Sequence, residues 1–167
     1  MPTSRTTITA STAVTAGALA LLASGLAATP ANAQSMTMVS ADWDSQAIMY
    51  MAGEGQVNDL YVTALGIGEE VREIGFNDEV AIQPGDHCRY LDPEDDTFVV
   101  CELPTGGTAP DDIHVFLGDG DDGLFTNDPG VTAVHGGPGN DELHAHTARM
   151  VMGEEGDDML MGADVLD

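Results

Sequence analysis

Carboxylate side chains recur in a fixed relation to glycines near the C-terminal end of this 167-residue chain. Asp122, Asp141 and Asp158 each follow a glycine by two residues, and each stands seven residues after a valine and two before a leucine. Calcium prefers carboxylate and backbone carbonyl oxygens as ligands. Glycine lets the backbone approach an ion closely because it has no Cβ atom. The pattern therefore predicts a calcium site built from several turns.

The three copies are spaced 19 and 17 residues apart, which is typical of stacked structural repeats. An Asp and a Leu two residues apart point to the same side of a β-strand. The expected inward columns are Val115, Val134 and Val151 on entering the turns, and Leu124, Leu143 and Leu160 on leaving them. The candidate metal-binding residues are Asp122, Asp141, Asp158, Gly118, Gly120, Gly137, Gly139, Gly156, Asp119 and Asn140. The pattern predicts an all-β fold in which the three main carboxylates form one ladder.

The tripled motif resembles the calcium-binding nonapeptide of the RTX family, the hemolysin-type repeat G-G-x-G-x-D-x-U-x, in which U is a large apolar residue. Residues 136–144 fit every fixed position. Leu117 replaces the first glycine of the first copy, and Glu154 replaces the second glycine of the third. The resemblance implies a parallel β-solenoid, or β-roll, with glycine- and Asp-rich turns. An N-terminal β region would continue into it or pack on it.

The resemblance also implies where the ions would lie. In the family, an ion sits between neighbouring turns on one edge, so three turns would give two sites that share Asp141. The opposite edge, expected at residues 126–130 and 146–149, lacks the G-x-D signature and is predicted to be poor in metal. Asp164 is a weak fourth candidate, because it follows Asp158 by six residues where nine are expected.

The charge of the chain limits its partners. It has 29 acidic and 4 basic residues, for a net charge of -25. Such a charge repels nucleic acid phosphates and anionic lipid head groups, and it attracts divalent cations. Solubility or adaptation to salt would explain the total charge, although neither explains why Asp recurs in phase with Gly, Val and Leu. We expect calcium ions as partners and no nucleic acid; a protein or cell-wall partner stays open.

The N-terminal segment indicates export. Residues 1–33 combine a short basic start, an Ala- and Leu-rich run and an A-x-A cleavage pattern, which predicts a signal peptide. The run is too short for a confident membrane span. We expect a secreted protein with an N-terminal β region at 34–107 and calcium-binding repeats at 108–167. The stretch 104–110, rich in Gly, Pro and Thr, would join them within one elongated β unit.

Two cysteines agree with an oxidising destination. Cys88 and Cys101 lie in two runs rich in β-forming residues, separated by the turn-like segment 92–96. Folding about that segment would bring the two thiols together, so a disulfide is predicted for an exported chain. A pair of free buried thiols, or a two-cysteine metal site with His87, are the alternatives.

The order of a G-Q-x-N-D-L-x-V stretch at residues 55–62, a P-G-x-x-C turn, a second Cys and then L-G-D-G-D-D is similar to small exported actinobacterial calcium-binding proteins of the RTX type. The chain contains neither a G-x-S-x-G nor an H-E-x-x-H motif, and we expect no enzyme activity. His144 and His146, with His135, form an alternative site for zinc or copper.

These features predict an exported calcium-binding repeat protein that folds and stiffens on extracellular calcium. The alternatives are a secretion or targeting tail of a hydrolase without its catalytic domain, and an extracellular adhesion or matrix protein.

Overall fold

Strands make up nearly all of the regular structure in the computed structural model, which describes residues 36–106, 110–162 and 165–166. The predicted signal peptide, part of the 104–110 joint and the candidate Asp164 lie outside these residues. Across the described ranges, no helix is long and apolar enough to cross a membrane.

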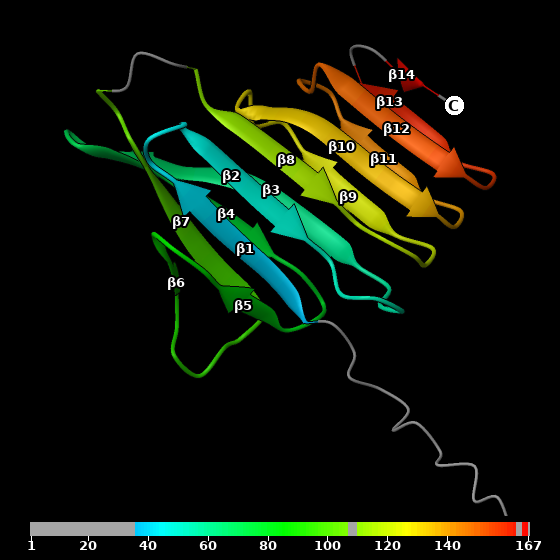
Figure 1. The fold of residues 1–167 in the computed structure, drawn as a ribbon, viewed down its shortest axis with the longest axis horizontal. Coiled ribbons are helices and arrows are strands. Elements are labelled where there is room, and N and C mark those ends of the chain that lie inside the picture. The colour runs from blue at the N-terminus through cyan, green and yellow to red at the C-terminus, as the bar shows by residue number, and fades with distance from the viewer. Residues whose placement is uncertain (1–35, 107–109, 163–164, 167) are drawn as a thin grey trace, which may run out of the picture. The chain divides into compact units, whose positions relative to one another are not determined.

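The strands form two seven-stranded sheets (Figure 1). Sheet A has the order β14 (Val165–Leu166), β12 (Met150–Glu155), β10 (Val131–Pro138), β8 (Asp112–Phe116), β2 (Ala47–Met51), β1 (Thr37–Asp42) and β5 (Ile82–Pro84). Sheet B has the order β13 (Met159–Gly162), β11 (Glu142–Ala145), β9 (Gly123–Thr126), β3 (Asp59–Ile67), β4 (Val71–Asn77), β7 (Phe98–Pro104) and β6 (Cys88–Tyr90).

The prediction of a parallel β-solenoid was wrong, although the expectation of an all-β chain is confirmed. Both sheets are mixed: β1 pairs with β2, β3 with β4, and β7 with both β4 and β6 in antiparallel fashion. The remaining pairs are parallel, including every pair among β8, β10, β12 and β14 and among β9, β11 and β13. The connections at residues 43–46 and 68–70 are too short for a parallel crossover, so they force antiparallel hairpins.

The core lies between the sheets and contains the expected apolar columns. Val115, Val134 and Val151 occupy matched positions on β8, β10 and β12, and all three are fully buried. Leu124, Leu143 and Leu160 are matched on β9, β11 and β13. Parallel pairing of β2 with β8 and of β3 with β9 extends the columns to Tyr50 and Leu60. The core is therefore continuous from the N-terminal strands into the repeats.

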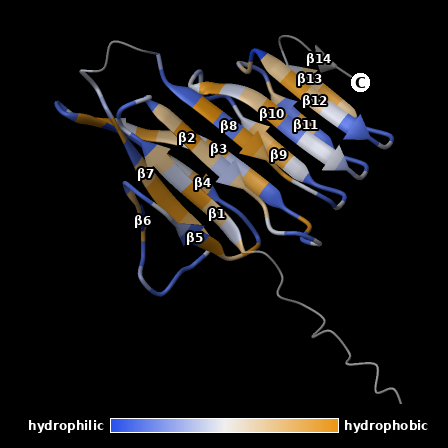
Figure 2. Cartoon of the chain, viewed as in Figure 1, coloured by the Kyte–Doolittle hydropathy of each residue, from blue (hydrophilic) through white to orange (hydrophobic). Residues whose placement is uncertain are grey.

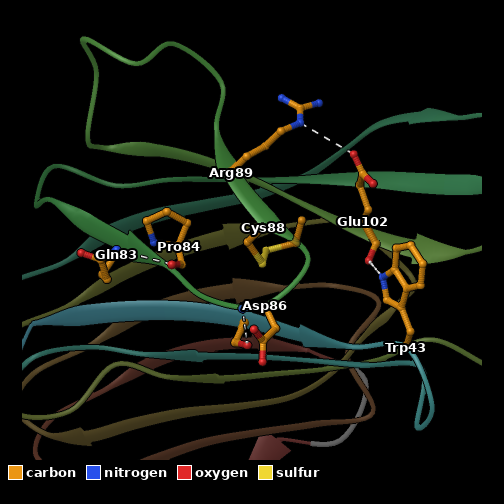
Figure 3. Close-up of a disulfide and its surroundings, with 9 residues drawn as sticks. Trp43, Gln83, Pro84, Asp86, Cys88, Arg89 and Glu102 are labelled. Carbon is orange, nitrogen blue, oxygen red and sulfur yellow. Dashed lines mark hydrogen bonds and ion pairs between the residues drawn. A yellow bond between two sulfur atoms is a disulfide. The ribbon is translucent and has the colours of Figure 1, made fainter.

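The predicted disulfide is confirmed. Cys88 on β6 and Cys101 on β7 are direct antiparallel partners, and their sulfur atoms are 2.05 Å apart. Beside the disulfide, the Trp43 indole donates a hydrogen bond to the Glu102 carbonyl oxygen (Figure 3). The same indole stacks on the His87 ring. Within the described part of the chain no cysteine remains free, which removes the alternative of two buried thiols.

Hydropathy separates the strands from the turns that join the sheets. Figure 2 shows hydrophilic residues gathered in the turns beyond the ends of β8, β10 and β12, whereas apolar residues dominate the strands. The strands that flank the turns pair in register, so the turns stack on one another. The polar side chains of neighbouring turns are therefore aligned.

Candidate metal centre

Four turns lie along one edge of the two sheets, each carrying the chain from a strand of sheet A to a strand of sheet B. They are residues 52–58 between β2 and β3, residues 117–122 between β8 and β9, residues 139–141 between β10 and β11, and residues 156–158 between β12 and β13. The flanking strands pair in parallel, so equivalent residues of neighbouring turns face one another. The three predicted carboxylates belong to the last three turns.

Backbone-to-carboxylate hydrogen bonds join these turns. The Asp122 backbone N–H donates to Asp141 Oδ1 at 2.9 Å, and the Asp141 N–H donates to Asp158 Oδ1 at 3.0 Å. The structure therefore places the three carboxylates in one row, as the repeat spacing predicts. We call this row, together with the residue that precedes it, the carboxylate ladder: Asn58, Asp122, Asp141 and Asp158.

Asp122 and Asp141 each accept a hydrogen bond from the preceding turn through one carboxylate oxygen, and the other oxygen has no partner among the described residues. Asp122 is 3% exposed and Asp141 is 2% exposed. Oδ2 of each accepts no hydrogen bond from any described residue, and the same holds for the buried Asn58 Oδ1. We call these three atoms the ladder oxygens. A buried carboxylate oxygen without a hydrogen-bond partner lowers the stability of the folded chain by about 1–3 kcal/mol or more. A positively charged ligand bound to these atoms would offset that cost.

Burial also shifts the acidity of the ladder. The pKa of Asp122 is raised from 3.8 to about 6, mainly by desolvation and additionally by the charges of nearby carboxylates, while the hydrogen bond from the Asn58 N–H lowers it. The pKa of Asp141 is also raised, first by burial and then by Asp158 and other nearby carboxylates. The ladder therefore holds negative charge at a free-energy cost, and a bound cation would offset that cost.

Glycine is required in the turns because their backbones stack directly on one another. A Cβ atom built on Gly139 would lie 1.7 Å from the Gly120 carbonyl oxygen, and one on Gly156 would lie 1.5 Å from the Gly139 carbonyl oxygen. A Cβ on Gly137 would lie 2.0 Å from the Gly118 carbonyl oxygen. The predicted glycines thus admit a column of carbonyl oxygens beside the carboxylates, which are the two ligand types that calcium combines.

Two further glycines make room for the carboxylates themselves. A Cβ on Gly136 would lie 2.1 Å from Asp141 Oδ2 and 2.9 Å from the Gly153 carbonyl oxygen. A Cβ on Gly153 would lie 2.0 Å from Asp158 Oδ2. In the first repeat the matched position is Leu117, which is fully buried. Asp141 Oδ2 and the Gly153 carbonyl oxygen consequently flank one small space between neighbouring turns.

The two remaining predicted ligands lie at the solvent side. Asp119 Oδ1 accepts a hydrogen bond from the Gly55 N–H at 2.6 Å. The exposed Asn140 donates through its backbone N–H and its side chain to Asp121 Oδ1, and it accepts from the Asp157 N–H. These contacts form an outer row that connects the turns, so Asp119 Oδ1 and the side-chain amide of Asn140 already have protein partners.

The opposite edge has a different electrostatic arrangement. Its buried carboxylate, Asp128, is 2% exposed and pairs with the Arg72 guanidinium, which also pairs with Asp111. Asp128 Oδ1 accepts from the Gly130 N–H at 2.8 Å, and the Asp128 carbonyl oxygen accepts from the Thr147 hydroxyl. At this edge the protein supplies its own cation, whereas the ladder edge combines buried carboxylates with carbonyl oxygens.

Side-chain ligands alone do not make a metal site here. Among the residues that the structure describes, no group of three or more His, Cys, Asp or Glu side chains could hold a metal ion. His135 lies beside Glu154 and His144 beside Glu142, each pair 3.0 Å apart. A site at the ladder must therefore draw on carbonyl and amide oxygens as well as carboxylates, which favours calcium over zinc or copper.

Sequence reasoning noted the stretch 55–62 but missed the ladder position of Asn58 and the buried Asp78. Asn58 occupies the first ladder position, and its side-chain amide donates to Asp78 Oδ2 at 2.8 Å. Asp78 also accepts hydrogen bonds from the backbone N–H groups of Asp59 and Glu79 and from the Tyr50 hydroxyl. The available signal was Gly53 and Gly55 before Asn58, with Leu60 two residues after Asn58, as in the repeats.

The chain matches no family model, no curated protein and no solved structure.

Proposed function

We propose that this chain is an exported, non-catalytic calcium-binding protein whose repeat turns hold calcium along the carboxylate ladder. The supporting observation is the pair of buried oxygens Asp122 Oδ2 and Asp141 Oδ2, which accept no hydrogen bond from the described residues yet lie beside stacked glycine turns. Two sites follow: one between residues 117–122 and 136–141, and one between residues 136–141 and 153–158. The resemblance of these turns to RTX repeats supports the same assignment.

The ligands of each site come from two neighbouring turns. The carboxylates of Asp122, Asp141 and Asp158 supply charge, and the carbonyl oxygens of the glycine-rich turns complete the six to eight oxygens that calcium takes. Because neighbouring carboxylates stand one β-spacing apart, the ion removes repulsion along the ladder. Calcium then stabilises the folded chain, by about 1.4 kcal/mol for each site when free calcium is ten times the dissociation constant.

The expected affinity follows from where the protein works. Extracellular calcium modules have dissociation constants on the order of 10⁻⁴ to 10⁻³ M, so such sites fill outside the cell and stay empty in the cytosol. The predicted signal peptide supports export. We propose that the protein binds calcium after secretion and becomes stiffer there.

Calorimetric titration of the chelator-treated chain with calcium, and separately with magnesium, tests the proposal. We expect calcium to bind with a measurable heat and to raise the urea concentration at the unfolding midpoint, with magnesium much weaker because it requires a small octahedral site. Neither heat nor a change in the midpoint at millimolar calcium would refute the proposal.

A further inference from the structure

The turn at residues 52–58 continues the ladder, although it lies outside the repeats. The Asn58 N–H donates to Asp122 Oδ1 at 2.7 Å. The two steps between the repeat turns use the same bond, from a backbone N–H to the next carboxylate, at 2.9 and 3.0 Å. The β2–β3 turn is therefore joined to the first repeat turn in the way that the repeat turns are joined to one another.

The backbone of this turn also stacks like a repeat. A Cβ atom on Gly120 would lie 2.5 Å from the Gln56 carbonyl oxygen. Gly139 stands in the same relation to the Gly120 carbonyl, and Gly156 to the Gly139 carbonyl. Gly55 has a φ of 72°, a left-handed conformation that favours glycine. Gln56 thus adds a third carbonyl oxygen to the column formed by the Gly120 and Gly139 carbonyl oxygens.

The Asn58 amide has a defined orientation. Its Nδ2 lies 2.8 Å from Asp78 Oδ2 and 3.0 Å from the Tyr50 hydroxyl. A carboxylate only accepts hydrogen bonds, so the amide nitrogen must face Asp78. Asn58 Oδ1 then points away from Asp78. This oxygen belongs to a residue that is 1% exposed, and it accepts no hydrogen bond from the described residues.

Two buried acceptors therefore occur at one step of the ladder. The Asn58 N–H donates to Asp122 Oδ1. Asn58 Oδ1 and Asp122 Oδ2 are the two acceptors that have no partner at this step. Two acceptors cannot satisfy each other, because neither the amide oxygen nor the ionised carboxylate oxygen carries a proton. Each bears negative charge or partial charge, and a cation satisfies both.

We propose that the 52–58 and 117–122 turns form a third calcium site, held by Asn58 Oδ1, Asp122 Oδ2 and the Gln56 carbonyl oxygen. This proposal rests on the proposed function and extends it beyond the repeats. The new site has an amide where the repeat sites have a second carboxylate. Because affinity rises with the number of charged ligands, it is the weakest of the three and fills last.

Counting calcium ions tests this third site. Equilibrium dialysis of the chain at saturating calcium should give three bound ions for the wild type and two for Asn58→Ala. Val57→Ala is the matched control, because Val57 is in the same turn and is 61% exposed; it should keep three. Two ions in both the wild type and Asn58→Ala would overturn the third site and leave the proposed function standing. No bound calcium in the wild type would overturn both.

Terbium luminescence gives a second measurement that does not remove the Asn58 side chain. Tb³⁺ replaces calcium and emits when a nearby tyrosine is excited. The Tyr50 hydroxyl lies 3.0 Å from Asn58 Nδ2, so a Tb³⁺ ion in the third site is close to the Tyr50 ring. Tyr50→Phe should remove most of the emission gained at the last, weakest step of the titration. Tyr61→Phe, at a position that is 48% exposed, should not. Unchanged emission in Tyr50→Phe would overturn the site.

Discussion

Stability in the absence of calcium should fall as the pH rises, because of Asp122. Its pKa is about 6 in the folded chain and 3.8 for the ordinary side chain. Between these values the folded chain binds a proton that the unfolded chain has lost. The contribution of Asp122 to the free energy of unfolding is therefore fully present below pH 3.8 and is lost as the pH rises through 6. The difference corresponds to about 3 kcal/mol for this one residue.

The proposed function predicts that calcium reverses this dependence, because calcium would bind the ionised ladder. Saturating calcium adds more stability at pH 7 than at pH 5, and calcium binding near pH 6 releases protons into the buffer. The raised pKa of Asp141 acts in the same direction. Both effects are absent if calcium binds elsewhere on the surface.

Urea unfolding in chelator between pH 4 and pH 8, followed by near-ultraviolet circular dichroism, measures the effect. Asp122→Asn should flatten the decline by about 3 kcal/mol relative to the wild type. Asp157→Asn, which changes an exposed carboxylate in the last turn, should keep the wild-type slope. An equal decline in the wild type and Asp122→Asn would show that burial of this carboxylate does not control the pH dependence.

Three further outcomes are expected. Gly139→Ala places a methyl group 1.7 Å from a backbone oxygen of the preceding turn and should destabilise the chain by about 3 kcal/mol in urea unfolding. Gly66→Ala, with no described atom within 4 Å of the added Cβ, should change stability by less than about 0.5 kcal/mol. Equal effects of the two substitutions would contradict the stacked turns. Asp141→Asn should reduce calcium-induced stabilisation more than Asp158→Asn, since Asp141 lies between two turns; titrations with the same midpoint shift for both would argue against a shared ligand. Reduction of the disulfide, which spans 13 residues, should lower the free energy of unfolding by about 3 kcal/mol, and an unchanged urea midpoint after reduction would show that the bond is not stabilising.

The repeats could be predicted in detail because the spacings of the valines, the leucines and the aspartates agree there. The valines and leucines keep one phase with Asp122, Asp141 and Asp158, so a single register satisfies both the core and the turns. The disulfide was predictable for a similar reason, since two β-rich runs flank one turn-like segment. In each case the sequence neighbours of a residue determine its partner in space.

The mixed sheets could not be predicted in the same way. Alternation of apolar and polar residues identifies a strand but not the direction of the strand beside it. In residues 37–104 the direction depends on short connections and on which hairpin packs against the next. The turn at 52–58 was not assigned to the ladder because Asn58 stands at the carboxylate position and the apolar Val57 at the outer one. The acidic signature is therefore missing, although the backbone geometry is kept.

The direction of the ladder hydrogen bonds makes the molecule extendable at one end. Every step runs from a backbone N–H to the carboxylate that follows it, from Asn58 to Asp158. At the starting end, Asp78 fixes the Asn58 side chain and the antiparallel strand β4 covers β3. At the other end, Asp158 is the last carboxylate of the ladder among the described residues, and a further turn stacked there would place its own carboxylate beside the Asp158 backbone N–H. Duplication of a segment of about 18 residues after β13 would add one turn to the ladder without disturbing the existing ones. If the proposed function is right, each added turn also adds one calcium site, so the length of the chain and its calcium capacity would change together.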